Sequence, residues 1–251
     1  MLHLVWSASI AANFAAALAV RLRRLPYPWF EAWLWAGAMG SVMLLLAGLP
    51  SSWTYFWAYV VIEPARWLLL AAAVHELYQR RIGGYRILSW AGSAVLWGAV
   101  LVAVIVTAIS SFAGSPGQAP EIAQVLLMIR RLAHSVLLVF CLATWLFFRY
   151  YPAPSCRNVA VHGLIMLVIL VGSVISTVGA WFGGTKLIDA FSVMNLICTA
   201  GCYVAWSVLL TREGEIEPEE ASLERASIAE AAAAKLVDGI RDAVKTAKVG
   251  H

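Results

Sequence analysis

The chain has 251 residues, of which 62% are apolar and only 13% charged, with a formal net charge of +4. A soluble domain is about half apolar and about a quarter charged, so this composition excludes a soluble globular enzyme and a disordered chain. The basic residues fall in short clusters between apolar runs. This spacing excludes a nucleic-acid-binding domain, leaves no nucleic acid among the expected partners, and is typical of a polytopic membrane protein.

Seven apolar runs are long enough to cross a bilayer, which takes roughly 20 residues of helix. None of them alternates strictly between apolar and polar residues as a barrel strand does. We therefore predict an all-α bundle of seven transmembrane helices. Short breakers separate the runs, the last of them at Gly183-Gly184-Thr185. The runs are 3–20, 32–49, 54–78, 87–112, 122–148, 159–182 and 187–210.

The basic residues at the ends of the runs predict an orientation. Alternate connections carry nine arginines, and the other side carries Lys186 alone. By the positive-inside rule the N-terminus lies outside and residues 211–251 are cytoplasmic, in a multi-pass protein of the bacterial inner (plasma) membrane. The arginines are Arg21, Arg23, Arg24, Arg80, Arg81, Arg86, Arg149, Arg157 and Arg212.

Tryptophans gather at the ends of the runs, where indole rings prefer the headgroup boundary. We expect nine of them to form an aromatic belt in the lipid headgroup region. At the outer ends these are Trp6, Trp53, Trp57 and Trp181, and at the inner ends Trp29, Trp33, Trp90, Trp145 and Trp206.

Ionisable residues inside the third run are informative, because charges in a bilayer are costly and are usually paired or functional. Glu63 lies about 12 Å deep, counted from Tyr55 at the helical rise. Arg66 follows at i+3, a spacing that allows an ion pair within the helix. Pro64 between them removes a backbone donor and favours a kink.

The fifth and seventh runs carry polar groups at a similar depth. In the fifth run, His134 lies one helical turn beyond the adjacent Arg130 and Arg131. The seventh run presents a continuous polar stripe that includes Asp189 and Asn195. The whole stripe is Asp189, Ser192, Asn195, Thr199 and Cys202.

These groups are predicted to face one another inside the bundle, with a surplus of about one positive charge. A buried surplus cation requires an anion, water or a cavity. We therefore expect an outward-facing, net-basic pocket for a small polar or anionic ligand. The alternative is a purely structural network in which every charge finds a partner. The predicted ligand-binding residues are Glu63, Arg66, Arg130, Arg131, His134, Asp189 and Asn195.

Cofactor signals are sparse. His75 and His162 lie at similar depth near inner helix ends and form the one pair that could ligate a b-type haem, although interfacial hydrogen bonding is the preferred interpretation. The cysteines have no zinc-ligand spacing, so no metal or cofactor is expected.

Small-residue stripes around Gly40 and Gly172 predict close packing between helices, within the chain or between copies.

The composition changes at residue 213, which divides the chain into a transmembrane domain, 1–212, and a cytoplasmic tail, 213–251. Pro218-Glu219-Glu220 is a favourable helix start, and apolar residues after it fall near one face. We expect an amphipathic helix in which residues 218–249 contact a second copy, the membrane surface or a cytoplasmic partner. A solvated tail is the alternative.

Topology invites comparison with rhodopsins and G-protein-coupled receptors, but the deciding residues differ. A retinal protein needs a lysine midway along its last helix, where this chain has Asn195 to Thr199. The receptor Asp/Glu-Arg-Tyr signature is replaced by His75-Glu76-Leu77-Tyr78. Residues 1–212 resemble bacterial seven-transmembrane-helix proteins of uncharacterised function and the membrane sensor regions of bacterial signalling proteins. The resemblance rests on topology and on a third-helix glutamate with a basic inner end.

Together these patterns predict a non-enzymatic membrane sensor or receptor-like protein that binds its ligand in the outer pocket and relays through the C-terminal helix. A small-anion channel or transporter is one alternative, and an assembly or scaffold subunit is another. Glu63 with His134 could do acid–base work, but neither a nucleophile nor a metal-ligand set accompanies them. We therefore expect no enzyme.

Overall fold

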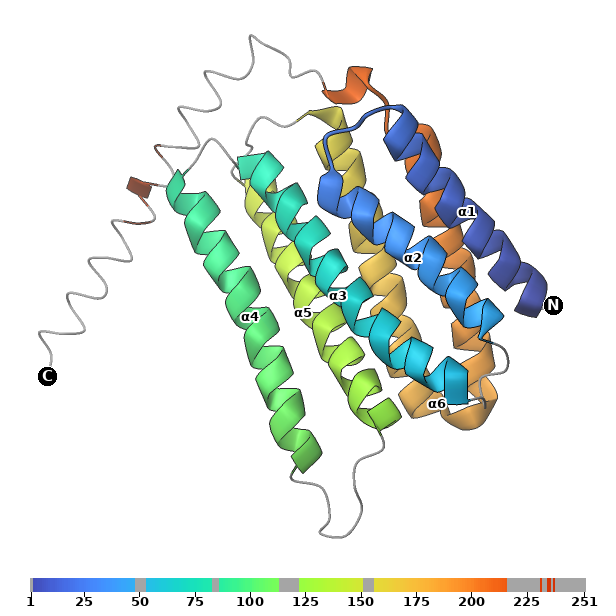
Figure 1. Cartoon of the computed structure of the whole chain (residues 1–251). Coiled ribbons are helices and arrows are strands. Elements are labelled where there is room, and N and C mark those ends of the chain that lie inside the picture. The colour runs from blue at the N-terminus through green and yellow to red at the C-terminus, as the bar shows by residue number, and fades with distance from the viewer. Residues whose placement is uncertain are drawn as a thin grey trace, which may run out of the picture.

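All long elements of the computed structural model are α-helices. The structure describes residues 2–47, 53–82, 86–112, 122–150 and 156–215. In the tail it describes residues 231, 234, 235 and 237. Within those ranges, the side chains of 2–4, 86–88, 103–104, 106–112, 122–129, 131 and 177–189 lie outside the description. The helices are α1 (Leu2–Leu22), α2 (Pro28–Leu46), α3 (Trp53–Ile82), α4 (Arg86–Phe112), α5 (Ile122–Tyr150) and α6 (Arg157–Leu209), followed by the short 3₁₀ helix η1 (Glu213–Glu215) (Figure 1).

Six described segments are long and apolar enough to cross a membrane. This confirms the prediction of an all-helical chain with several membrane-spanning candidates. In α4 the described apolar segment is the shorter Ser89–Val102. The count of seven crossings and the orientation stay predictions. The six segments are Val5–Leu22, Pro28–Leu46, Trp53–Ile82, Leu132–Tyr150, Arg157–Ser176 and Ala190–Leu209.

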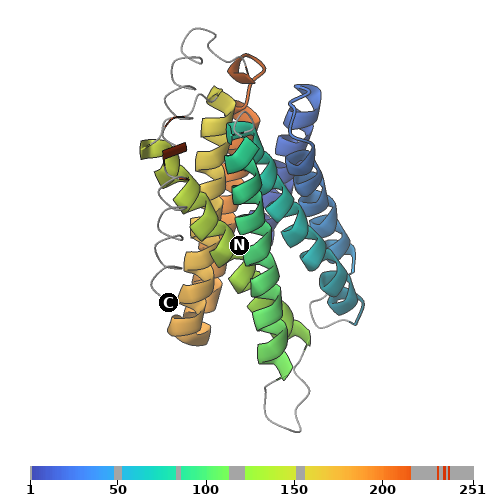
Figure 2. The same ribbon diagram turned by 90° about the vertical axis from the view of Figure 1, so that its left-hand side faces the viewer.

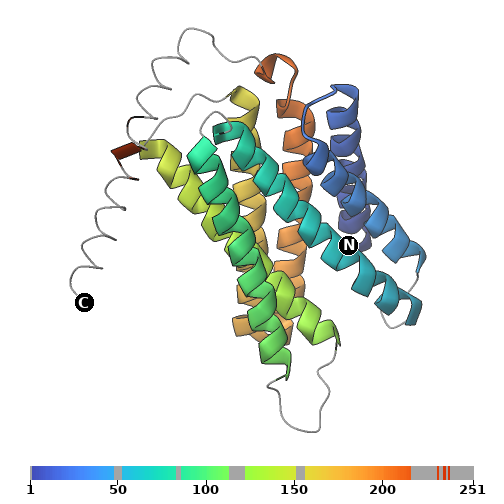
Figure 3. The ribbon, with the colours of Figure 1, turned by 60° about the vertical axis from the view of Figure 1, so that its left-hand side comes forward.

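The backbone of α6 stays helical from Arg157 to Leu209, yet the helix folds back on itself. The Ser176 hydroxyl donates to the Phe191 carbonyl at 3.0 Å, although 15 residues separate them. A straight helix would hold those residues about 22 Å apart. The two halves of α6 therefore lie antiparallel as two legs (Figure 3). The break predicted at 183–185 is a reversal within helical backbone rather than a non-helical loop.

The helices run side by side in one bundle (Figures 1 and 2). α1 packs against α2 and α6, α3 packs against α2 and α5, and α4 lies at the edge against α3 and α5. The end of α3 with Arg80 and Arg81, the end of α5 with Arg149 and the start of α6 gather at one end of the bundle. We call this the arginine-rich end.

Large apolar side chains occupy both the inside and the outside of the bundle. Leu34, Met166 and Leu170 are fully buried, whereas Val61 is 69% and Val139 66% exposed. An apolar outer surface of this kind is the surface that a lipid bilayer covers. All six α-helices contribute to the main core cluster, through Ala16 of α1, Leu34 of α2, Leu70 of α3, Leu96 of α4, Leu137 of α5 and Leu170 of α6.

Two tryptophans expected in the aromatic belt belong instead to the core. Trp33 is 6% exposed and Trp206 is fully buried, whereas Trp53 and Trp90 are exposed as predicted. The two core indoles meet edge to face with ring centroids 5.8 Å apart. The expectation was wrong for this pair because depth along a helix does not say which face a residue occupies. Trp33 and Trp206 lie on faces that meet other helices.

Small residues bring helices into close contact within the chain. A Cβ on Gly40 of α2 would stand 2.7 Å from the Ile62 methyl group of α3. A Cβ on Gly172 would stand 3.2 Å from the Cys198 sulfur on the second leg of α6. The small-residue stripes on α2 and α6 therefore serve packing inside one chain at these positions.

Candidate functional site

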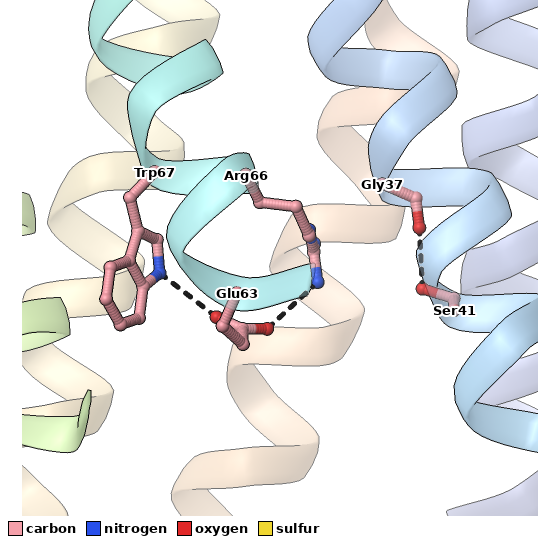
Figure 4. A network of polar contacts seen from close by, with 5 residues as sticks. All are labelled: Gly37, Ser41, Glu63, Arg66 and Trp67. Atoms are coloured by element: carbon pink, nitrogen blue, oxygen red, sulfur yellow. Dashed lines mark hydrogen bonds and ion pairs between the residues drawn. The ribbon is translucent and has the colours of Figure 1, made fainter. Parts of the chain in front are cut away.

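Glu63 lies at the centre of the candidate site, on a helix that continues through Pro64. Its side chain is 8% exposed, and both carboxylate oxygens accept hydrogen bonds (Figure 4). Arg66 donates to one oxygen at 3.2 Å, and the Trp67 indole N–H donates to the other at 3.0 Å. The i,i+3 ion pair predicted from the sequence is therefore formed, and the indole satisfies the second oxygen of the carboxylate.

Arg130 and His134 approach this pair from α5. The Arg130 guanidinium interacts with the Tyr59 hydroxyl, which also lies within electrostatic reach of Glu63. His134 is within electrostatic reach of Arg130, Glu63 and Arg66. Its Nδ1 lies 2.7 Å from the Arg130 carbonyl, so the tautomer with the proton on Nδ1 donates there.

Arg66 extends from α3 toward α1, α2 and the second leg of α6 (Figure 4). One of its terminal nitrogens lies 3.8 Å from the position of a Cβ on Gly37. Tyr203 on α6 is 4% exposed and interacts with the same guanidinium. The cation therefore joins α3 to two other helices, and Tyr203 is a neighbour that hydropathy did not reveal.

Asn13 of α1 is a polar residue of this region that the sequence analysis missed. It is 3% exposed. With its carboxamide oriented to satisfy both ends, the nitrogen donates to the Leu34 carbonyl at 3.2 Å and the oxygen accepts from the Ala38 N–H at 3.0 Å. Asn13 could have been found from the sequence as a lone asparagine in an Ala-rich run. A buried amide requires hydrogen-bond partners, so such a residue indicates a polar contact with another helix.

The remaining predicted residues divide into two groups. Asn195 lies on the second leg of α6, where its side-chain oxygen is 3.7 Å from the Cβ position of Gly172. It therefore faces the first leg of its own helix. The predictions for the Arg131 and Asp189 side chains fall outside the described residues, as do those for tail residues 218–249 apart from the four described positions.

The cluster of Tyr59, Glu63, Arg66, Arg130 and His134 is the candidate site, which we call the α3–α5 polar cluster. Among its described side chains there are two guanidinium groups and one carboxylate. No carboxylate of the described residues forms an ion pair with Arg130. A half-buried cation without a countercharge attracts an anion or holds water, so this arrangement suits anion binding.

The two histidines considered as haem ligands have different neighbours. His75 Nε2 lies 2.9 Å from the Ser93 hydroxyl on α4, and its ring packs near Trp97. His162 is fully buried, with its ring centroid 4.2 Å from that of Phe30 and 5.4 Å from that of Trp206. Among the contacts of the described residues the two rings share no neighbour, and the haem alternative stays a prediction.

Glu76 is a structural carboxylate at the arginine-rich end that the sequence analysis did not single out. Its Oε2 accepts from the backbone N–H groups of Trp29 at 3.1 Å and Phe30 at 3.0 Å. These amides belong to the first turn of α2, where no intrahelical partner exists. A carboxylate there also meets the positive end of the helix dipole. Glu76 therefore caps α2 from α3.

The exit of α6 is tied to two other parts of the arginine-rich end. Asn158 donates to the Thr211 carbonyl and to Glu215, each at 2.6 Å. Arg212 donates to the Arg23 carbonyl at 2.8 Å, and Arg23 donates to the Leu210 carbonyl. The segment that leads into the tail is thus held to the α1–α2 turn and to the start of α6.

Two titratable groups outside the spanning segments meet at this exit. Burial raises the pKa of the Tyr27 hydroxyl well above its ordinary value, and the nearby Glu215 carboxylate adds to the shift. Burial and Glu215 likewise raise the pKa of the Cys156 thiol. Both groups therefore stay neutral through the physiological pH range.

No protein-family model matches the chain, and no curated protein or solved structure matches it.

Proposed function

We propose that this protein is a non-enzymatic membrane sensor or receptor-like protein that binds a small polar or anionic ligand at the α3–α5 polar cluster. The proposal places the cluster in the outer half of the membrane, with the arginine-rich end in the cytoplasm of a bacterium. The asymmetry of basic residues between the two ends supports that orientation.

One observation carries the proposal. Arg66 and Arg130 share the neighbourhood of Glu63, the one buried carboxylate near them among the described side chains. In a surrounding of low dielectric a second guanidinium beside one carboxylate is costly unless an anion or water compensates it. A ligand with a carboxylate, phosphate or sulfate group would supply that compensation through charge-assisted hydrogen bonds.

The hydrogen bonds of Glu63 favour a binding role over acid–base catalysis for this carboxylate. Both oxygens of Glu63 are occupied, by Arg66 and by Trp67. A general base needs a free acceptor within reach of the proton that it removes.

The packing beyond the cluster favours a closed site over a pore. Leu137 lies one turn beyond His134 on α5 and is 1% exposed. Leu70, one turn beyond Arg66 on α3, and Leu170 on α6 belong to the same buried cluster. These packed side chains obstruct a polar path toward the arginine-rich end, which supports a sensor over the alternative of an anion channel.

The relay to the cytoplasm is proposed to run through α6. Tyr203 contacts Arg66 of the cluster, and the same leg of α6 ends at the segment held by Arg23 and Asn158. A ligand that changes the position of Arg66 would therefore act on the helix that leads into the tail.

The proposal is tested with the full-length protein in lipid nanodiscs and the probes chloride, sulfate, inorganic phosphate and acetate. We expect at least one anion to raise the unfolding temperature of the wild type in a saturable way. Arg130→Gln should fold but lose that response. Arg21→Gln is the control, since its side chain is 71% exposed and it lies on α1, outside the α3–α5 polar cluster.

The proposal fails if no anion shifts the unfolding temperature of the wild type, or if Arg130→Gln and Arg21→Gln respond alike. A tracer-flux measurement in liposomes distinguishes transport from sensing. Anion uptake that depends on Arg130 would contradict the sensor proposal and support the channel or transporter alternative.

A further inference from the structure

A groove lies between α3, α5 and the first leg of α6, close to the arginine-rich end and separate from the α3–α5 polar cluster. It has a volume of about 130 Å³. Leu77 and Val159 on its floor are buried, whereas Trp145 is 44% and Leu164 57% exposed at its edge. The groove therefore opens sideways, on the surface that faces the hydrocarbon of a membrane.

Arg81 is the cation of this groove. It lies in the last turn of α3 and is half-buried, with its guanidinium carbon 4.4 Å from the centroid of the Phe148 ring. Its Nε is buried without a hydrogen-bond partner. No carboxylate in the described ranges forms an ion pair with Arg81.

Other arginines at this end show how unusual that position is. Arg21 pairs with Glu31, Arg80 donates to the Pro26 carbonyl, and Arg212 donates to the Arg23 carbonyl. Arg149 is exposed. A partly buried guanidinium with an unused Nε donor beside an apolar groove is suited to bind an oxygen anion.

We propose that this groove binds one molecule of anionic phospholipid, with its phosphate on Arg81 and an acyl chain along the apolar wall between α5 and α6. The guanidinium fork matches a phosphate in a bidentate manner. Arg149 lies one turn beyond Trp145 on the same face of α5, so a second positive charge stands near the mouth. This charge favours an anionic over a zwitterionic headgroup.

The lateral opening decides between a lipid and a free anion. A water-soluble anion would have to enter past Trp145 and Leu164, which face acyl chains in a membrane. A phospholipid already lies there, and its headgroup stands at the level of the helix ends. The apolar lining by Leu77, Phe140 and Leu164 suits a hydrocarbon chain and gives no benefit to inorganic phosphate.

The test uses the full-length protein, delipidated in detergent and supplemented with phosphatidylglycerol or with phosphatidylcholine of the same acyl chains. Bound lipid is counted by native mass spectrometry, and the unfolding temperature is measured in parallel. We expect phosphatidylglycerol to bind at about one per chain and to raise the unfolding temperature. Arg81→Gln should weaken that binding about tenfold or more.

Ala160→Phe gives an independent variant, because Ala160 is exposed and lines the groove. The larger ring fills the groove and leaves Arg81 unchanged, so it decides the question if Arg81→Gln does not fold. Arg21→Gln is the matched control for charge, since its side chain is 71% exposed and α1 does not line the groove. It should retain the lipid, and so should Arg130→Gln of the polar cluster.

Three results would each overturn the proposal. One is equal binding of phosphatidylcholine and phosphatidylglycerol. Another is a full thermal shift with glycerol phosphate, which carries the headgroup chemistry without acyl chains and would indicate a free-anion site. The third is retention of the lipid by every folded variant of Arg81 and Ala160.

Discussion

Asn13 of α1 lies so close to Gly37 of α2 that a Cβ on the glycine would stand 2.7 Å from a terminal atom of the Asn13 carboxamide. The same carboxamide is positioned to bond the α2 backbone at Leu34 and Ala38. The glycine therefore makes room for a polar side chain that joins two helices where Arg66 also approaches.

Gly37→Ala should displace the Asn13 carboxamide and weaken its bonds to α2. We expect a loss of about 1–3 kcal/mol in the free energy of unfolding in detergent. In an Asn13→Ala background the same substitution should cost little, because the clashing group is gone. Gly98→Ala is the control, since nothing lies within 4 Å of its Cβ position. Equal effects of Gly37→Ala in both backgrounds would refute the coupling.

Glu63→Gln should be strongly destabilising, because it leaves the Arg66 guanidinium without its countercharge. Removing one partner of a buried ion pair costs about 3–5 kcal/mol. The double variant Glu63→Gln with Arg66→Met should recover much of this loss, since no unpaired charge remains. Chemical unfolding of the four proteins in the same detergent gives the coupling free energy. Additive single effects would contradict the pairing.

Glu76→Gln should destabilise the chain by weakening the cap of α2. A charged acceptor at two backbone N–H groups and at the positive end of a helix dipole is worth about 1–3 kcal/mol. Glu31→Gln is a matched control, because Glu31 lies in the first turn of the same helix but pairs with an Arg21 side chain that is 71% exposed. Such an exposed pair contributes about 1 kcal/mol or less. Thermal unfolding that ranks Glu31→Gln as the more damaging change would argue against the cap.

Cys156 should react slowly with maleimide at neutral pH, because its raised pKa keeps the thiol protonated. In a variant with Cys156 as the single cysteine, Glu215→Gln should shift the pH profile of alkylation to lower pH. A change in access alone would scale the rate equally at every pH, so the position of the profile distinguishes the two causes.

The same raised pKa has a consequence for stability. Above about pH 8.5 the thiol of the unfolded chain loses its proton while the folded thiol keeps it. Stability should therefore fall as the pH rises through this range, and Cys156→Ser should reduce that dependence. A steeper decline in Cys156→Ser than in the wild type would contradict the assignment.

Much of the fold was predictable because hydropathy over a helix length reports burial in lipid directly. The runs that start at residues 54 and 122 correspond to α3 and α5. The reversal inside α6 was predicted from Gly183 and Gly184. That the backbone stays helical through this reversal was not predicted. The roles of Trp33 and Trp206 were not predictable, since the sequence gives depth along a helix and not the neighbour that each face meets.

In the candidate site, the Glu63–Arg66 pair followed from local spacing alone. The approach of Arg130 and His134 followed from their matching depth on another helix. Asn13, Tyr59 and Tyr203 were missed because uncharged polar residues give a weak signal in an apolar run. Glu76 was missed because its partners are backbone amides, which a sequence does not distinguish from one another.

The cap on α2 also constrains the order of events during biosynthesis. Residues 28–30 leave the ribosome well before residue 76, so the first turn of α2 is made without the carboxylate that completes it. Until α3 has been made, those amides lack the carboxylate and depend on water. The first turn of α2 is therefore completed only when α3 packs beside it, so the two helices are better regarded as one unit of folding than as two independent ones.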